Sequence, residues 1–220
     1  MGLPLAGYAI RMAQDDIFRT FCEAIPPRST AKVLDLGVAN ETNPHANFFE
    51  RRYPYESMVT CAGLSDGGNF RVAFPQIAYV QIAAHDGLPF ADREFDVVFC
   101  NAVLEHVGGR EQRRRFVSEA LRVGRDIFIA VPNRWFPVEH HSGLPLLHFM
   151  PALYRRALKT TRLSYWSEQE HLDFLSARSL GRELAEWSGA RVTHCGIRLG
   201  MFSSNVAAIW SRGNEMAPRS

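Results

Sequence analysis

Short apolar runs rich in β-branched residues alternate along the chain with segments in which apolar residues recur at a helical period. Apolar runs of roughly four to eight residues indicate strands, and a period of about 3.6 residues indicates helices. The runs predict seven strands, over residues 32–36, 58–64, 79–83, 95–101, 126–131, 191–198 and 205–210. Strands that alternate with helices are typical of a mostly parallel sheet covered on both faces.

Helical periodicity is found between these runs. It predicts helices over residues 8–24, 45–52, 110–123 and 177–187. In the third of these the apolar side chains share one face, formed by Phe116, Val117, Ala120 and Leu121. The charged side chains that we expect to face water include Arg113, Arg114 and Glu119. We therefore interpret the arginines of this helix as a solvated face and not as a nucleic-acid surface.

The alternation is interrupted after the fifth predicted strand. Residues 133–151 are rich in proline, histidine and aromatic residues, and they are too long for a plain connection and too apolar for a linker. We interpret residues 1–220 as one domain, with an N-terminal helical cap over 1–30 and an insertion over 133–175 that forms a lid over a substrate.

Composition supports a globular α/β protein. The 220 residues are 46% hydrophobic and 22% charged, enough to bury one sizeable core. Lys and Arg total 25 against 23 Asp and Glu, a net charge of +2. With so little net charge and no long run of like charges, we expect no nucleic-acid partner.

The cysteines and the apolar segments point to a reducing compartment. Cys22, Cys61, Cys100 and Cys195 are widely separated, without the spacing of a metal site, and we expect buried thiols. The sequence shows no secretory signal and no uncharged apolar stretch of the roughly 20 residues that span a membrane. We therefore expect a cytoplasmic protein without an integral membrane segment.

The first predicted strand ends in a turn suited to a nucleotide-like ligand. Its sequence, residues 33–37, is VLDLG, and ligands of doubly wound sheets bind at the carboxyl ends of the strands. The run resembles the first motif of the class I S-adenosylmethionine-dependent methyltransferases, in which a strand leads through an acidic residue to a glycine-rich turn. Residues 38–41, VANE, lack the further glycines of that motif.

A second stretch carries the resemblance further. Residues 88–107, LPFADREFDVVFCNAVLEHV, are similar to the segment that precedes, forms and follows the fourth strand of small-molecule methyltransferases of this class. The resemblance covers residues 32–133 well and the closing helix and strands more loosely. It implies a Rossmann-like doubly wound, mostly parallel sheet of seven strands with an antiparallel last strand, S-adenosylmethionine as cofactor, and methyl transfer to a small organic acceptor.

The resemblance also implies where the cofactor binds. An acid at the end of the second strand would meet the ribose hydroxyls, and an acid before the Leu-Pro-Phe sequence would accept the adenine amine. The cofactor-binding residues that we predict are Asp35, Gly37, Val38, Ala39, Asn40, Asp66, Asp86, Gly87, Asn101 and Ala102. A structural role stays open for three of them: helix capping for Asp66 and Asp86, and a turn-fixing hydrogen bond for Asp35. The register of the adenine acid also leaves a position nearer Ala84 open.

Residues after the fifth strand gather groups that can remove a proton. Methyl transfer requires an aligned nucleophile and a proton acceptor, and histidine is suited to that task near neutral pH. Our catalytic candidates are His106, Glu139 and His140. A purely structural role in the cofactor loop or in the insertion stays open for each. The set Glu139, His140, His141 and His148 has metal-ligand chemistry but no helical zinc spacing, so we expect no metal site.

Two other functions are compatible with such a sheet. A nicotinamide-dependent oxidoreductase is disfavoured, because the first turn lacks GxGxxG and Asp66 lies 29 residues after Gly37, beyond the usual spacing of about 20. A non-catalytic binding or scaffold protein of the methyltransferase fold remains the main alternative, because fold does not establish activity.

The insertion itself has two interpretations. An apolar block from Trp135 to Tyr154 runs into the basic residues Arg155, Arg156, Lys159 and Arg162. Such a segment can cover an apolar or aromatic acceptor, or it can make peripheral contact with an anionic membrane. We favour the lid, because Pro137, Pro145 and Pro151 prevent one continuous amphipathic helix.

Overall fold

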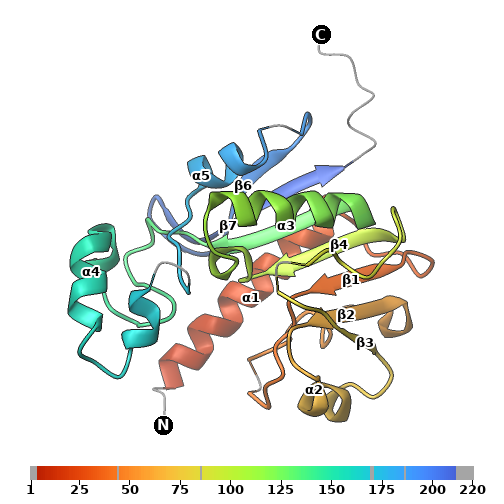
Figure 1. The fold of residues 1–220 in the computed structure, drawn as a ribbon, viewed down its shortest axis with the longest axis horizontal. Coiled ribbons are helices and arrows are strands. Elements are labelled where there is room, and N and C mark those ends of the chain that lie inside the picture. The colour runs from red at the N-terminus through yellow and green to blue at the C-terminus, as the bar shows by residue number, and fades with distance from the viewer. Residues whose placement is uncertain (1–3, 44, 85, 169–170, 186, 212–220) are drawn as a thin grey trace.

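A seven-stranded sheet in the order β3-β2-β1-β4-β5-β7-β6 forms the centre of the molecule (Figure 1). The computed structural model describes residues 4–43, 45–84, 86–168, 171–185 and 187–211. The strands are β1 (Val33–Leu36), β2 (Val59–Gly63), β3 (Ala78–Gln81), β4 (Phe95–Asn101), β5 (Gly124–Pro132), β6 (Arg191–Leu199) and β7 (Phe202–Ser211). Strand β7 runs antiparallel to β5 and β6, and the other pairs are parallel. The predicted α/β, Rossmann-like sheet with an antiparallel last strand is confirmed.

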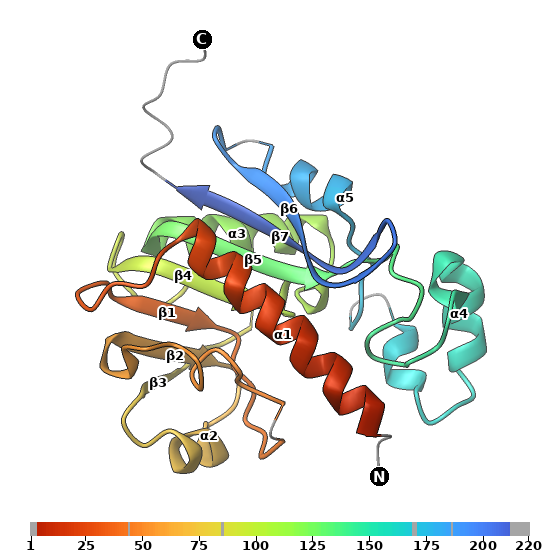
Figure 2. The same cartoon turned by 180° about the vertical axis from the view of Figure 1, so that it is seen from behind.

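Helices cover both faces of this sheet. Helix α1 (Pro4–Ala24) crosses one face, and α3 (Arg110–Val123) and α5 (Ala177–Glu183) lie on the other (Figures 1 and 2). Under α1 the core is aromatic, with the ring of Phe21 in edge contact with Phe99 and Phe128. The opposite core is aliphatic, because the apolar stripe of α3 packs onto β4 and β5.

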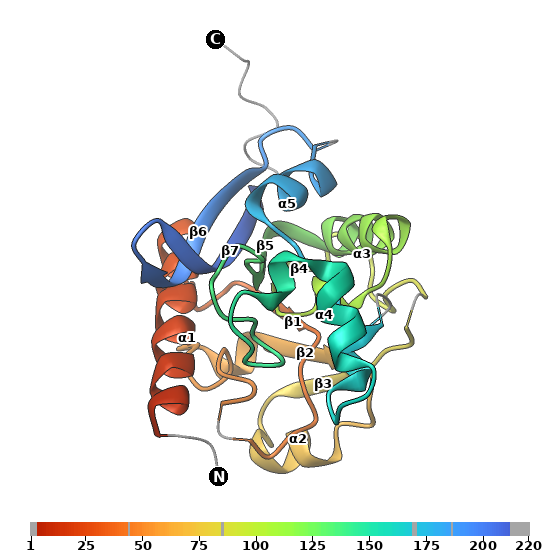
Figure 3. The same ribbon diagram turned by 90° about the vertical axis from the view of Figure 1, so that its left-hand side faces the viewer.

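The carboxyl ends of the parallel strands meet at one edge, and the insertion lies in front of it (Figure 3). The insertion contains helix α4 (Pro151–Leu158), which begins at a proline, a residue well suited to a first helical turn. A further short helix, α2 (Gly68–Ala73), follows β2. The remaining elements are single 3₁₀ turns: η1 (Glu56–Met58), η2 (Leu104–His106), η3 (Leu147–Phe149) and η4 (Ser164–Ser167).

One helix prediction is wrong, and another extends beyond the end of its helix. The described residues of segment 45–52 form successive turns instead of a helix, and Asn47 within it adopts a φ of 53° that no α-helix accommodates. The side chain of Asn47 instead bonds the backbone N–H and C=O of Ala39. The helix predicted over 177–187 ends at Glu183; residue 186 lies outside the described residues.

Arg113 does not face water as predicted. It is buried, and its guanidinium donates hydrogen bonds to Glu183 at 2.9 Å, Asp173 at 2.7 Å and the carbonyl of Gly108 at 2.8 Å. Helical periodicity placed it on the polar side of α3, but that side is covered by α5 and by the end of the insertion. The arginine therefore joins three segments that are distant in the sequence.

The insertion has a small core of its own. Tyr154, Leu158 and Leu172 are buried together, and partly buried side chains pack around them: Leu144, Leu147, Leu163, Trp166 and Phe174. Of the four cysteines, all unpaired, Cys61, Cys100 and Cys195 are buried and Cys22 is half-buried. Within the described parts of the chain, none of the helices combines the length and the apolar character needed to cross a bilayer.

Candidate functional site

A cleft of about 450 Å³ opens at the carboxyl edge of the sheet. Its floor comes from the ends of β1 and β2 and from the segments that follow β3 and β4, and its far wall comes from α3. Volumes of roughly 300–1,000 Å³ are usual for small-molecule sites. The apolar side chains of its walls include Leu36, Leu64, Ile82, Val103 and Phe116, and its polar side chains include Asp86, His106 and Gln112.

Only glycine fits at the turn after β1. Gly37 has a φ of +101°, and a Cβ added there would lie 2.2 Å from a methyl carbon of Val103. The turn is therefore in close contact with the segment that follows β4, and the backbone of Gly37 lines the cleft. Gly37 thus lies at the cleft, and its contact with a cofactor stays a prediction.

The residues after Gly37 are held by neighbouring turns. The amide of Asn40 donates to Asp66 at 3.2 Å and its oxygen accepts from the N–H of Phe70, while Asn47 brackets Ala39. Val38 is buried. Val38, Ala39 and Asn40 do not line the cleft themselves, so within the described residues they support the turn from behind.

Asp66 is exposed and does not line the cleft. Its carboxylate accepts from Asn40 and, at 3.1 Å, from the N–H of Gly68, the first residue of α2. At the end of β2 itself a side chain is excluded, because a Cβ at Gly63 would lie 2.6 Å from the Tyr79 hydroxyl and 2.8 Å from the Val38 carbonyl. The predicted ribose contact of Asp66 therefore requires its side chain to reorient.

Asp35 is buried beneath the turn. It lies on the α1 side of β1, within 4.8 Å of polar atoms of Glu50 and Cys61. Burial, followed by the nearby Glu50 carboxylate, raises the pKa of Asp35 well above its usual range. Its position fits support of the turn more than direct contact with a ligand in the cleft.

The remaining predicted cofactor residues divide into two groups. Asp86 and Gly87 line the cleft, and Asp86 is exposed there, as a reader of an adenine amine would be. Asn101 and Ala102 end β4 outside the lining; Ala102 has a φ of 56° and donates to the Ala130 carbonyl. The side chain that reaches the cleft from this segment is the next one, Val103, which sequence reasoning missed.

His106 connects the cleft with the insertion. It lines the cleft, and its ring lies 4.8 Å from the His141 ring and 5.6 Å from the Trp166 ring, between centroids. Its Nδ1 donates to the carbonyl of His171 at 2.6 Å, which leaves the lone pair on Nε2. Burial lowers the pKa of His106, so the ring is neutral near pH 7 and able to accept a proton or bind a ligand.

The other two catalytic candidates occupy different surroundings. Glu139 is buried, and its carboxylate accepts from the backbone of His141 and Ser142 and from the hydroxyls of Ser142 and Tyr154. Although burial raises the pKa of Glu139, these hydrogen bonds bring it below its ordinary value. His140 is exposed. Glu139 thus anchors the insertion, and neither residue lines the cleft.

The residues of the cleft fit S-adenosylmethionine at two of its three parts. The glycine turn after β1 leaves open backbone where its amino acid portion would bind, and apolar walls beside Asp86 suit adenine. The ribose would be met by the edge formed by Gly63 and Leu64, where no carboxylate lines the cleft.

Known proteins were compared by sequence and by structure. A family model described as a methyltransferase domain matches residues 54–126. No curated protein matches the sequence.

Several solved structures share the fold. An S-adenosylmethionine-dependent methyltransferase from Thermotoga maritima is 12% identical with a TM-score of 0.60, over 93% of this chain and 92% of that chain. One from Methanosarcina mazei is 16% identical with a TM-score of 0.60, over 88% and 96%. One from Aquifex aeolicus is 15% identical with a TM-score of 0.53, over 88% and 89%.

Proposed function

We propose that this chain is a class I S-adenosylmethionine-dependent methyltransferase and that it methylates a small organic acceptor with an apolar or aromatic part, bound between the cleft and the insertion. One observation carries the proposal. The His106 side chain lines the cleft and at the same time packs against His141 and Trp166 of the insertion. An acceptor held there would lie beside both the methyl donor and a group that can act on its hydroxyl or amine.

The protein's share of the reaction follows from this placement. The bound S-adenosylmethionine supplies an electrophilic methyl group, so the protein aligns the nucleophile and assists the loss of its proton. The His171 carbonyl holds the His106 ring in one orientation through Nδ1. Nε2 is then the atom through which we propose that His106 acts on the acceptor.

The shape of the insertion supports an acceptor with an apolar part. Trp166 lies against both His106 and His141, and Leu144 and Leu147 belong to the same small core. Leu146, Met150 and Leu153 are exposed. Covering the acceptor would exclude water from the methyl transfer.

Two experiments test the proposal. Calorimetry should detect binding of S-adenosylmethionine and S-adenosylhomocysteine and none of NAD(P)H. Incubation of metabolite extracts with methyl-labelled S-adenosylmethionine should then yield labelled products that identify the acceptor. Cofactor binding without any labelled product would favour a scaffold role, and loss of label transfer to soluble acceptors together with liposome binding would favour the membrane interpretation.

His106→Ala tests the assigned residue. We expect turnover to fall by roughly 10²–10⁴-fold, the usual contribution of a positioned proton acceptor, with S-adenosylhomocysteine affinity nearly unchanged. His194→Ala, an exposed histidine on β6, is the matched control and should keep wild-type turnover. Full activity of the His106 variant would exclude the role.

A further inference from the structure

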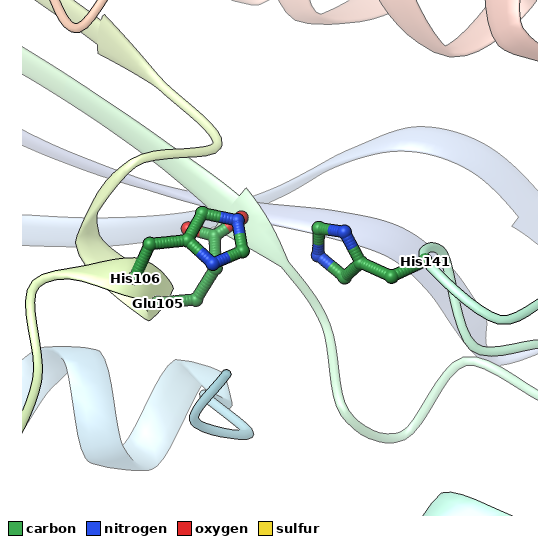
Figure 4. Close-up of side chains that lie close together, drawn as sticks. All are labelled: Glu105, His106 and His141. Carbon is green, nitrogen blue, oxygen red and sulfur yellow. The ribbon is translucent and has the colours of Figure 1, made fainter. Parts of the chain in front are cut away.

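Three metal-ligand side chains converge between the cleft and the insertion. One ligand atom each of Glu105, His106 and His141 lies within 4.8 Å of the other two. Figure 4 shows the ring of His141 pointing toward the ring of His106, with the Glu105 carboxylate next to the ring of His106; the two ring planes are 77° apart. The Glu105 Oε1 to His106 Nε2 distance is 3.8 Å. The first two residues come from η2 after β4, and the third lies in the insertion.

Three polar atoms of this cluster are buried and have no hydrogen-bond partner among the described residues. Both carboxylate oxygens of Glu105 and Nε2 of His141 have no hydrogen bond to any described residue. Glu105 is only 1% exposed. Burying an unpaired carboxyl group costs several kcal/mol on the scale of polar transfer, so such a group calls for a ligand.

A cavity of about 20 Å³ adjoins Glu105 and His141. One water molecule or one metal ion fills a space of that size, since a water needs roughly 10–15 Å³ by this measure. The surrounding contacts prepare the imidazoles for ligation. His106 donates through Nδ1 to the His171 carbonyl, the usual outer contact of a metal-binding histidine, and the His141 backbone is fixed by Glu139.

We propose that Glu105, His106 and His141 bind one divalent transition-metal ion. Two imidazoles and one carboxylate are a frequent ligand set of zinc and of other divalent transition metals, with one or more positions left for water or substrate. Ligands about 2.0–2.2 Å from a tetrahedral ion lie about 3.4 Å apart. A shift of the side-chain ligand atoms by roughly 1 Å would therefore bring them to the distances that one ion requires.

The position of the site assigns it a task in the reaction, and this part rests on the proposed function. His106 belongs to the lining of the donor cleft, and His141 belongs to the segment that covers the acceptor. With the ion in place, Nε2 of His106 would be one of its ligands, and His106 would act on the acceptor through the ion. The open position would bind an oxygen or nitrogen of the acceptor, orient it toward the methyl donor and lower its pKa, so that its proton passes to water. Acceptors with a coordinating hydroxyl or amine beside their apolar part are then preferred.

Direct binding tests the site without any acceptor. After removal of metals by chelation, we expect the full chain to bind one Zn²⁺ or one Co²⁺ per molecule in calorimetry, with visible absorption bands of a low-coordinate Co²⁺ complex. Glu105→Gln and His141→Ala should each weaken binding at least roughly tenfold. Circular dichroism and thermal melting would establish that each variant is folded.

His194→Ala is the matched control, because this exposed histidine on β6 lies outside both the cluster and the lining of the cavity. It should bind both ions like the wild type. Absence of stoichiometric binding, or an equal loss in the His194 variant, would overturn the metal site. Methyl transfer that persists with a chelator present would overturn the catalytic task of the ion while the proposed function stands.

Discussion

Single buried acids show how this chain accommodates ionisable groups inside its core. Asp35 is in the middle of the sheet next to Glu50, and the Glu50 carboxylate accepts from the Cys61 thiol at 3.1 Å. Burial raises the pKa of Asp35 and of Glu50. The folded chain therefore holds protons on these groups at pH values where the unfolded chain has released them.

Asp35→Asn should flatten the pH dependence of stability. An acid whose pKa is raised on folding binds more protons in the folded state, so the free energy of unfolding falls as pH rises from about 4 through the folded pKa. The slope is at most about 1.4 kcal/mol per pH unit for one group. The variant should lose this slope in denaturant titrations between pH 5 and 8. Asp86→Asn, at an exposed acid, should keep it, and an unchanged slope in Asp35→Asn would contradict the assignment.

The sequence predicted single residues of the site better than the cluster of side chains that they form in space. His106 was selected because it follows the fourth strand, and it lies at the cleft. Its neighbour in space is His141, whereas the sequence favoured the adjacent His140. Two consecutive residues point in different directions, and periodicity cannot orient side chains in an irregular loop. The cluster with Glu105 depends on that orientation, so the sequence did not predict it.

The insertion is the element that we propose to cover the acceptor. Its core residue Tyr154 is fully buried, and the Tyr154 hydroxyl donates to Glu139 at 2.9 Å. Glu139 also accepts hydrogen bonds from the backbone N–H groups of His141 and Ser142. One hydrogen-bond network thus joins α4 to the loop that carries His141.

Tyr154→Phe should loosen the insertion without unfolding the sheet. Loss of a buried hydrogen bond to a charged acceptor costs about 1–3 kcal/mol. We expect faster hydrogen exchange in Pro151–Leu158, a lower turnover, and unchanged S-adenosylhomocysteine affinity. Tyr165→Phe changes an exposed tyrosine of the same segment and should alter none of these. Equal exchange rates in wild type and Tyr154→Phe would count against the network.

At the element scale, regular patterns were predicted and irregular ones were not. All seven strands were predicted, and the parallel ones at the centre of the sheet were the clearest because buried parallel strands are continuous apolar runs. Helix α3 was placed to the residue because its apolar stripe is regular. The short helices α2 and α4 were missed, since six and eight residues carry little periodicity. The false helix at 45–52 contains Asn47, whose side chain bonds the β1 turn, a tertiary contact that local sequence does not encode.

Helix α3 connects the cleft with the insertion and with α5. One side of it, through Gln112, Arg115 and Phe116, lines the donor cleft. From the other side Arg113 reaches Asp173 at the end of the insertion and Glu183 in α5. The backbone of Asp173 also donates to the Glu105 carbonyl at 2.8 Å. The helix that lines the cleft and the insertion are therefore joined by ion pairs and hydrogen bonds.

The ion pairs of Arg113 imply heterotropic cooperativity between the two substrates. A donor ligand that orders α3 lowers the conformational entropy that is lost when the acceptor binds. By linkage, each substrate should then raise the affinity of the protein for the other. We expect S-adenosylhomocysteine to slow hydrogen exchange in Pro151–Leu158, far from its own contacts, and Asp173→Asn to weaken that protection while donor affinity changes little. Glu111→Gln removes an exposed pair on the same helix and should preserve it. Protection that survives in Asp173→Asn would mean that the two substrates bind independently.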